Sequence, residues 1–142
     1  MGTQENKDIV RRQLEVVFNQ GKGSAAVPEF WADEAASDGG PQGRAQLAKH
    51  IDMMLASFPD WKFTVHELIA EGDRVVAHLS VKATYQKPFP ALAEIPAVGQ
   101  PVAREQVNIF TLRDGRITHL HVVADNSTMQ RMAAEGAKTA AR

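Results

Sequence analysis

The stretch that decides the fold runs from Val102 to Ala124 and reads VAREQVNIFTLRDGRITHLHVVA. Apolar and polar residues alternate on both sides of Asp114-Gly115, a dipeptide that favours a two-residue hairpin turn. The sequence therefore predicts two antiparallel strands, Val102–Arg113 and Arg116–Ala124. Because alternate side chains of a strand point to the same face, each strand should present one row of residues to the core.

Two further strands precede this hairpin. Residues 62–70 and 74–85 are rich in β-branched residues and flank a turn at 71–73. The connection over 86–101 should be irregular, because it holds four prolines: Pro88, Pro90, Pro96 and Pro101. We therefore expect the second half of the chain to form a four-stranded antiparallel meander.

The first half of the chain shows helical periodicity. Apolar residues spaced three and four apart predict helices over 5–20, 28–36 and 44–58, and a short closing helix is expected over 126–134. Helices followed by an antiparallel sheet indicate an α+β fold in a single domain, residues 1–142. A curved sheet wrapped over the N-terminal helices forms a cone, and the hollow at its open end is a natural ligand cavity.

The composition argues against several classes of protein. The chain carries 16 basic and 17 acidic residues, so no basic excess indicates binding to nucleic acid or to an anionic membrane. It has no cysteine, which excludes disulfides and thiolate chemistry. No apolar run reaches the roughly 18 residues of a membrane span, and the polar N-terminus lacks a signal-peptide core. We expect a cytoplasmic protein and, without nucleotide-binding or serine-hydrolase motifs, no cofactor.

Candidate chemistry gathers at the end of the last strand. In strict alternation, one face carries Ile117, His119, His121, Val123 and Asp125. Desolvation there would raise the pKa of the Asp125 carboxyl and make it a better base near neutral pH. An equal alternative for Asp125 is to cap the following helix, a position that aspartate favours. His119 and His121 could hold a metal only with a third ligand, for which Asp125 is the candidate; a pair of ordinary strand histidines is the favoured interpretation, so we expect no metal site.

The neighbouring strand adds two amides. Gln106 and Asn108 alternate with apolar residues and share a face with Phe110. A buried amide needs a hydrogen-bond partner, which a bound carbonyl or the backbone could provide. Glu105 should point to the opposite face, toward helices or a partner chain, because a charge inside would be costly.

Other polar and aromatic residues have two interpretations each. His78 and Tyr85 should lie on opposite faces of the strand over 74–85. Trp31 and Phe58 belong either to the plain core or to the wall of a pocket that accepts aromatic ligands. His50, between Leu47 and Met54 on a predicted helix, is interpreted as a surface or packing residue.

In combination, these features resemble the SnoaL-like polyketide cyclases, within the nuclear-transport-factor-2-like superfamily, over residues 6–132. Each motif is weak alone, but their order and spacing are fairly specific for the fold. The residues that carry the resemblance are Val10-Arg11-Arg12, Phe18-Asn19, Gly40-Pro41, Gly43, Phe58-Pro59-Asp60, Glu71-Gly72-Asp73-Arg74-Val75-Val76, Glu105-Gln106-Val107, Asp114-Gly115-Arg116-Ile117, Asp125 and Gln130.

The resemblance implies a cone-shaped α+β barrel with an internal pocket, assembled as a homodimer or homotetramer. It implies that Asp125 is the acid/base for intramolecular aldol closure of a hydrophobic or aromatic polyketide, as in antibiotic biosynthesis. Gln106 matches a glutamine of the family, whereas Asn108 and Tyr85 stand where the cyclases carry histidines. Asparagine can donate a hydrogen bond to an enolate but cannot carry a proton.

Two hypotheses follow. In the first, the protein is an enzyme: Asp125 removes a proton alpha to a carbonyl, Gln106 and Asn108 stabilise the enolate, and the enolate attacks a second carbonyl or, in a cofactor-independent hydroxylase, meets oxygen. In the second, the protein is a non-catalytic ligand-binding module of the same fold. The expected substrate contacts are His121, His119, Tyr85, His78, Phe58, Trp31 and Phe110, and a pocket blocked by Trp31, Phe58 or Trp61 would favour the second hypothesis.

Overall fold

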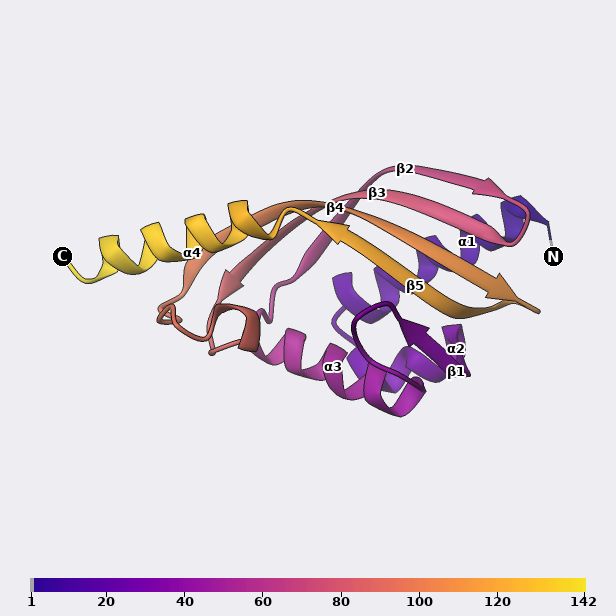
Figure 1. Cartoon of the computed structure of the whole chain (residues 1–142), viewed down its shortest axis with the longest axis horizontal. Helices are drawn as coiled ribbons and strands as arrows, with labels where there is room; N and C mark the ends of the chain where they lie inside the picture. The colour runs from indigo at the N-terminus through magenta and orange to yellow at the C-terminus, as the bar shows by residue number, and fades with distance from the viewer. Residues whose placement is uncertain (1) are drawn as a thin grey trace.

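The structure, a computed structural model, describes residues 2–142 and has the expected α+β class: a five-stranded sheet with helices packed on one face (Figure 1). The helices α1, α2 and α3 lie below the sheet in this view, and α4 extends from one end of it. In chain order the elements are α1 (Thr3–Gln13), a π-helical turn (Leu14–Asn19), a 3-10 turn (Gly23–Ala26), α2 (Val27–Phe30), β1 (Trp31–Ser37), α3 (Arg44–Ser57), β2 (Lys62–Glu71), β3 (Arg74–Tyr85), a 3-10 turn (Pro90–Leu92), β4 (Gln100–Arg113), β5 (Arg116–Ala124) and α4 (Asn126–Ala140).

The strands are arranged in the order β1-β5-β4-β3-β2, and the sheet is open. The meander from β2 to β5 is antiparallel, as predicted, but β1 adds a fifth strand that runs parallel to β5. The predicted helix over 28–36 is therefore wrong beyond Phe30, where α2 ends and β1 begins. Pairing of Trp31 with Ile117 and of Ala36 with His119 overrides the helical spacing of this segment.

The hairpin between β4 and β5 turns at Asp114 and Gly115, as predicted. Both residues have positive φ, 52° and 79°. Two consecutive left-handed residues characterise the tight hairpin turn whose twist matches that of the flanking strands, which explains the Asp-Gly dipeptide. This turn fixes the register of β5 on β4.

A bulge at Thr118 then changes the faces of β5. Ile117 pairs with Leu112, whereas His119 pairs with Thr111, so Thr118 has no partner of its own. Before the bulge Ile117 points inward and is fully buried. After it, the residues that line the cavity described below are Leu120, Val122 and Ala124. The predicted shared face of Ile117, His119, His121 and Asp125 is therefore wrong, because one extra residue reverses the alternation.

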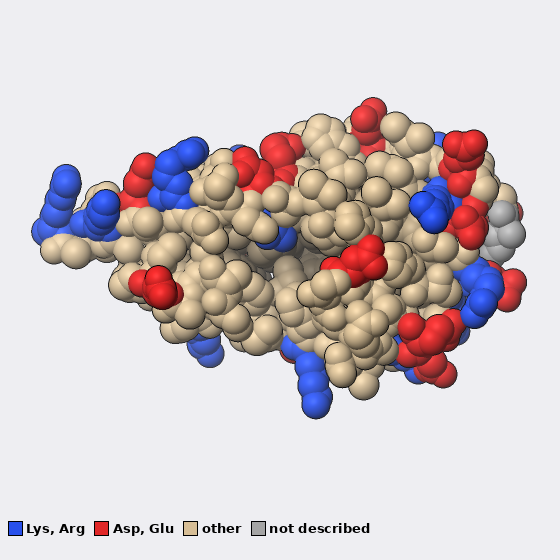
Figure 2. Space-filling view, viewed as in Figure 1, with Lys and Arg blue, Asp and Glu red and all other residues tan. Residues whose placement is uncertain are grey.

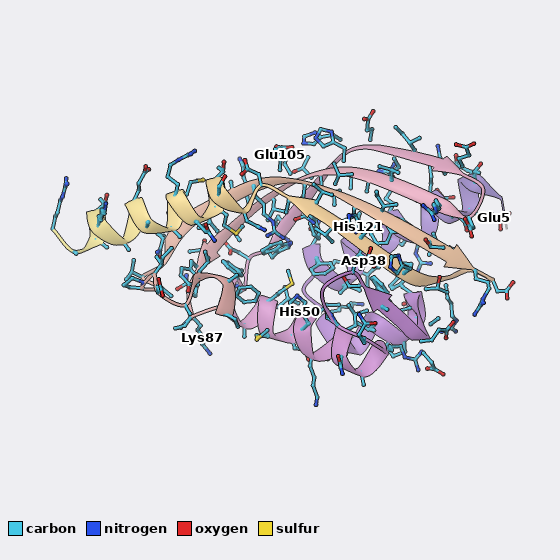
Figure 3. All side chains as sticks on the ribbon, in the orientation of Figure 1. Glu5, Asp38, His50, Lys87, Glu105 and His121 are labelled. Carbon is cyan, nitrogen blue, oxygen red and sulfur yellow. The ribbon has the colours of Figure 1, made fainter. Side chains whose placement is uncertain are left out.

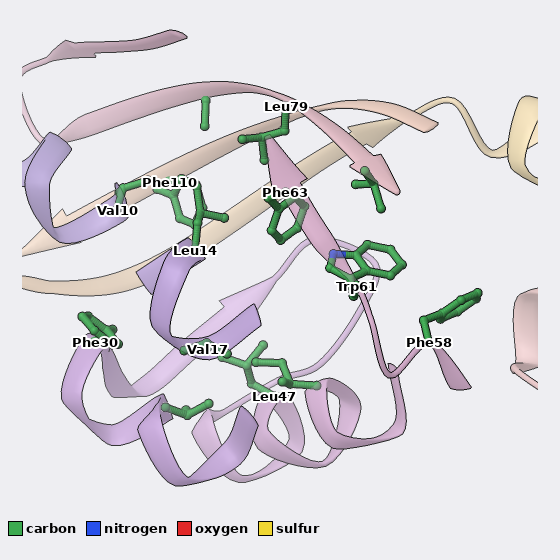
Figure 4. Close-up of a cluster of buried hydrophobic side chains, with 14 of the residues drawn as sticks. Val10, Leu14, Val17, Phe30, Leu47, Phe58, Trp61, Phe63, Leu79 and Phe110 are labelled. Carbon is green, nitrogen blue, oxygen red and sulfur yellow. The ribbon is translucent and has the colours of Figure 1, made fainter. Parts of the chain in front are cut away.

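The core fills the space between the helices and the inner face of the sheet (Figure 4). From the N-terminal helical segment, Val10, Leu14 and Val17 pack against this face. The end of this segment is tied to β2, because the Asn19 amide exchanges hydrogen bonds of 3.0 and 2.7 Å with the backbone of Phe63. These hydrogen bonds fix the end of the N-terminal helical segment against β2.

The last helix, α4, is longer than predicted and continues to Ala140. It lies against β4, where the buried side chain of Gln100 donates 3.0 and 2.8 Å hydrogen bonds to the carbonyl oxygens of Ala133 and Pro96. Gly136 faces Gln100 at this contact, and a Cβ atom there would lie 2.5 Å from the Gln100 Cβ. Among residues 2–142, no helix is both long and apolar enough to cross a membrane.

Candidate functional site

A cavity of about 500 Å³ lies between the inner face of the sheet and α3. The space-filling view shows the face hollowed at this position, with basic atoms at the rim of the hollow (Figure 2). Its walls are mostly apolar, and the side chains that line it include Leu14, Phe18, Trp31, Leu47, Ile51, Met54, Phe58, Trp61, Phe63, Phe89, Leu92, Phe110, Leu120, Val122 and Met129. No aspartate or glutamate of the described chain lines it, and Arg104 is its only lysine or arginine.

Three polar side chains of β4 form a directed hydrogen-bond chain along the cavity wall. Arg104 Nε donates to Gln106 Oε1 at 2.9 Å, and Gln106 Nε2 donates to Asn108 Oδ1 at 2.8 Å. A guanidinium can only donate, so it orients the Gln106 amide, and that amide in turn orients Asn108. The Asn108 N–H groups are left to face a ligand. The predicted placement of Gln106 and Asn108 on one inner face is confirmed.

Arg104 places a desolvated positive charge in this wall. Its guanidinium lies 5.2 Å from the centre of the Trp61 ring, and its Nη1 donates to Asn126 Oδ1 at 2.9 Å. Burial lowers the pKa of Arg104 to about 10, so the group is still protonated at neutral pH. Its hydrogen-bond partners in the described chain are neutral amides, and no carboxylate forms a salt bridge with it.

His50, on α3, is the imidazole that lines the cavity (Figure 3). It is half-buried, and its ring meets Phe89 edge-on at 6.2 Å between centroids. Desolvation lowers its pKa below 6.5, which leaves the ring neutral at neutral pH and able to accept a proton. The sequence interpretation of His50 as a surface or packing residue missed its place in the cavity wall, although the spacing from Leu47 and Met54 already places His50 on the apolar face of α3.

Asp125 caps α4 and is not among the cavity-lining residues. Its carboxylate accepts hydrogen bonds from Thr128 N at 3.1 Å, Thr128 Oγ1 at 2.6 Å and Ser127 Oγ at 2.9 Å. The hydrogen bonds from Thr128 are the main cause of a lowered pKa of Asp125, and the predicted rise by desolvation is wrong. The alternative role as a helix cap is confirmed. Ala124 and Asn126, on either side, do line the cavity.

His119 and His121 are not among the residues that line the cavity, and both contact Asp38, in the loop between β1 and α3. Figure 3 shows His121 beside Asp38. Asp38 carboxylate oxygens lie 2.6 Å from His119 Nε2 and 2.8 Å from His121 Nδ1. These two hydrogen bonds lower the pKa of Asp38. Because residues 39–41 of the same loop line the cavity, the two histidines shape its edge without reaching into it.

Of the remaining predicted substrate contacts, some line the cavity and others lie outside it. Trp31, Phe58 and Phe110 line the cavity. Tyr85 is buried, stacks on Phe58, and supports the connection after β3: its hydroxyl donates to the Leu92 carbonyl at 3.0 Å and accepts from the Phe89 N–H. His78 lies on the face of the sheet opposite Tyr85, as strict alternation predicts, where it contacts Glu105; the structure therefore does not place the expected substrate contact at His78 in this cavity.

Comparison with known proteins agrees with this fold. The family model described as SnoaL-like polyketide cyclase matches residues 8–133. TsrD from Streptomyces laurentii has a similar structure, with a TM-score of 0.82, 19% identity, and 94% of this chain and 97% of that chain covered. IdmH from Streptomyces antibioticus, described as a candidate polyketide cyclase, has a TM-score of 0.75 and 25% identity over 89% of this chain and 96% of its own.

AclR from Streptomyces galilaeus, described as a candidate hydroxylase, has a TM-score of 0.79 and 22% identity over 94% of this chain and 98% of its own. None of the curated proteins compared with the chain matches it. These structural neighbours therefore share one fold, although one is described as a candidate cyclase and another as a candidate hydroxylase.

Proposed function

Because the chain belongs to the family of SnoaL-like polyketide cyclases, we propose that it is an enzyme that forms an enolate from a largely apolar, ring-bearing polyketide-type ketone and closes a new ring by intramolecular aldol addition. The observation that carries the proposal is the oriented chain from Arg104 through Gln106 to Asn108 in an apolar cavity. It presents hydrogen-bond donors, backed by a positive charge, where a carbonyl oxygen would become an enolate.

In this proposal the Asn108 amide is the oxyanion donor. Its N–H groups are fixed before substrate arrives, and preoriented donors stabilise charge that develops in the transition state. The positive charge of Arg104 polarises the chain and strengthens the last donor. Loss of one oxyanion donor typically lowers kcat by about 10²–10³-fold. Asn108 can therefore stabilise the enolate although it cannot carry the proton that a histidine would.

We assign the base to His50. It lines the same cavity and is neutral at neutral pH, whereas the Asp125 carboxylate is hydrogen-bonded at the start of α4 and is weakly basic. His50 takes the proton alpha to the ketone, and the electron pair moves onto the oxygen bound by Asn108. The enolate carbon then attacks a second carbonyl of the same molecule, and the protonated imidazole returns its proton to the new alkoxide. Asp125, the base implied by the family, is the alternative.

The test does not require the natural substrate. Solvent deuterium exchange at the alpha carbon of 2-tetralone, followed by NMR in D₂O, reports enolate formation directly. We expect the protein to accelerate exchange over buffer and Asn108→Leu to reduce the acceleration by about 100-fold. His50→Ala should remove it, while Asp125→Asn should retain it. The reverse ranking of the last two variants would assign the base to Asp125.

Two outcomes separate the alternative functions. Binding of 2-tetralone without any exchange above buffer would favour the non-catalytic binding module. The description of AclR as a candidate hydroxylase gives the second alternative, in which the same enolate reacts with oxygen. Uptake of dissolved oxygen during exchange, measured with an electrode, would identify that reaction, and exchange without uptake is expected for the cyclase.

A further inference from the structure

A second group of chemically capable side chains lies on the outer face of the sheet, away from the cavity. His66 of β2, His78 of β3 and Glu105 of β4 offer two imidazole nitrogens and a carboxylate oxygen that all lie within 4.8 Å of one another. The two imidazole rings are 4.8 Å apart, and His78 Nε2 lies 3.1 Å from Glu105 Oε2. Figure 3 shows Glu105 on the side of the sheet opposite α3.

The backbone of three adjacent strands holds these side chains together. In β2 a bulge falls at His66, because Val65 pairs with Leu79 and Glu67 pairs with His78. Alternation from the inward-facing Val65 places His66 on the outer face with His78, and the bulge lets both His66 and Glu67 lie opposite His78. Three ligands on three hydrogen-bonded strands are placed by the sheet itself, and strands position side chains more precisely than loops do.

Ser80 orders the carboxylate. It pairs with Glu105 across β3 and β4, and its hydroxyl donates to Glu105 Oε1 at 2.5 Å. This contact leaves Oε2 on the side of the histidines. Carboxylates that bind a metal are themselves hydrogen-bonded, and such outer partners orient the ligands of the site. His66 Nε2 also contacts the Ser80 hydroxyl, at 2.5 Å, and would exchange that contact for a metal ion.

We propose that His66, His78 and Glu105 form a binding site for a divalent transition metal, with zinc as the ion that suits them best. Two imidazoles and one carboxylate are a donor set that Zn²⁺ accepts, with water in the fourth position. Ligand atoms of a tetrahedral zinc lie about 3.4 Å apart, given bond lengths of about 2.0–2.2 Å. The three atoms reach that separation by small side-chain rotations. The ion would join the edge strand β2 to β4, across β3.

The test is calorimetric titration of ZnCl₂ into metal-free protein, with Co²⁺ absorption spectra as an independent measure of coordination. We expect one saturable ion per chain. His66→Ala, His78→Ala and Glu105→Gln should each weaken binding at least about tenfold, because even outer partners of a metal site contribute 10–100-fold. His119→Ala is the matched control, since His119 is another histidine of the sheet that contacts a carboxylate, that of Asp38, and this variant should bind zinc as the unaltered protein does.

Two results of this titration would overturn the proposed zinc site. Absence of saturable binding at millimolar ZnCl₂ contradicts it, and so does binding that persists unchanged in His66→Ala and His78→Ala. Circular dichroism establishes that each variant is folded. Glu105→Gln serves as the most conservative variant, because it keeps the size of an exposed side chain and removes only its charge.

Discussion

At the scale of single residues, the feature of this cavity that most restricts its ligand is the positive charge of Arg104 in a mostly apolar wall. Arg104 is half-buried, and among residues 2–142 no carboxylate forms a salt bridge with it; a partly desolvated charge without a partner is costly to a folded protein. A ligand that brings an acidic group would offset that cost. The cavity should therefore prefer an aromatic acid to a neutral aromatic compound of the same shape.

Replacing Arg104 with methionine tests this preference. We expect the affinity for 2-naphthoate to fall by about 10–100-fold, since hydrogen bonds to charged groups contribute about 1.5–3 kcal/mol, while that for 2-naphthamide changes little. Fluorescence titration measures both, and the exposed Arg11→Met is the matched control. Equal losses for acid and amide would instead limit Arg104 to orienting Gln106.

The pH dependence of enolate formation should follow His50. As a base, this imidazole must be neutral, and burial lowers its pKa below 6.5. The rate of 2-tetralone exchange should therefore stay constant above pH 6.5 and fall about tenfold per pH unit only below the lowered pKa. If Asp125 were the base, the rate would instead fall only below pH 3.8, the ordinary pKa of an aspartate, because the pKa of Asp125 is lowered.

Asp125 has a role in stability that is separable from catalysis. Its folded-state pKa is depressed, so its stabilising contribution is present above pH 3.8 and is lost as the pH falls through the lowered pKa. Asp125→Ala should lower Tm at neutral pH, whereas Asp125→Asn should lower it less, since asparagine also caps helices. Thermal unfolding followed by circular dichroism compares them, and identical Tm values for all three proteins would refute the cap.

At the scale of elements, the periodicity of the sequence predicts most of the strands. It does not show where a strand carries a bulge, that is, one residue without a partner on the neighbouring strand. The hairpin at Asp114-Gly115, the strands β2 to β5 and the inner row of β4 follow from alternation and turn chemistry. The bulge at Thr118 does not, because threonine suits a regular strand equally well. That one residue moves His119 and His121 from the cavity to the outer side.

The fifth strand was missed for a related reason. Residues 31–37 carry no clear alternation, and only pairing with β5 makes them extended. The three ligands of the proposed metal site come from separate strands, so no spacing in the sequence brings them together. Contacts between distant segments are thus the part of the site that periodicity cannot supply.

The contact between α4 and β4 gives a prediction at the same scale. Gly136→Ala should favour helix by up to about 1 kcal/mol from intrinsic propensity alone. The new Cβ would overlap Gln100, 2.5 Å away at its Cβ, and overpacking costs about 1–3 kcal/mol. We expect a net loss of about 1 kcal/mol in urea unfolding. Ala134→Gly, which changes propensity without this contact, is the control, and a more stable Gly136→Ala would contradict the close packing.

At the scale of the whole molecule, the two halves of the chain contribute different kinds of residues to the wall of one cavity. The helical half supplies an apolar wall and the neutral His50, and the sheet supplies the polar row of β4. The termini lie at opposite ends of the long axis, and α4 and the connection after β3 border the space between. A cavity of about 500 Å³ falls within the range of small-molecule sites. Its volume therefore limits the size of the ligand that it can enclose.

Filling this volume should abolish binding without unfolding the protein. Leu120 lines the cavity on β5, and Leu120→Trp would place a large ring in open space, where overpacking does not arise. We expect the affinity for 2-naphthoate to fall more than about tenfold, since occluded space excludes a ligand that the cavity must enclose. The control is Val123→Trp on the same strand, because Val123 points outward and is 57% exposed. Retained binding in Leu120→Trp, or its loss in Val123→Trp, would place the ligand outside this cavity.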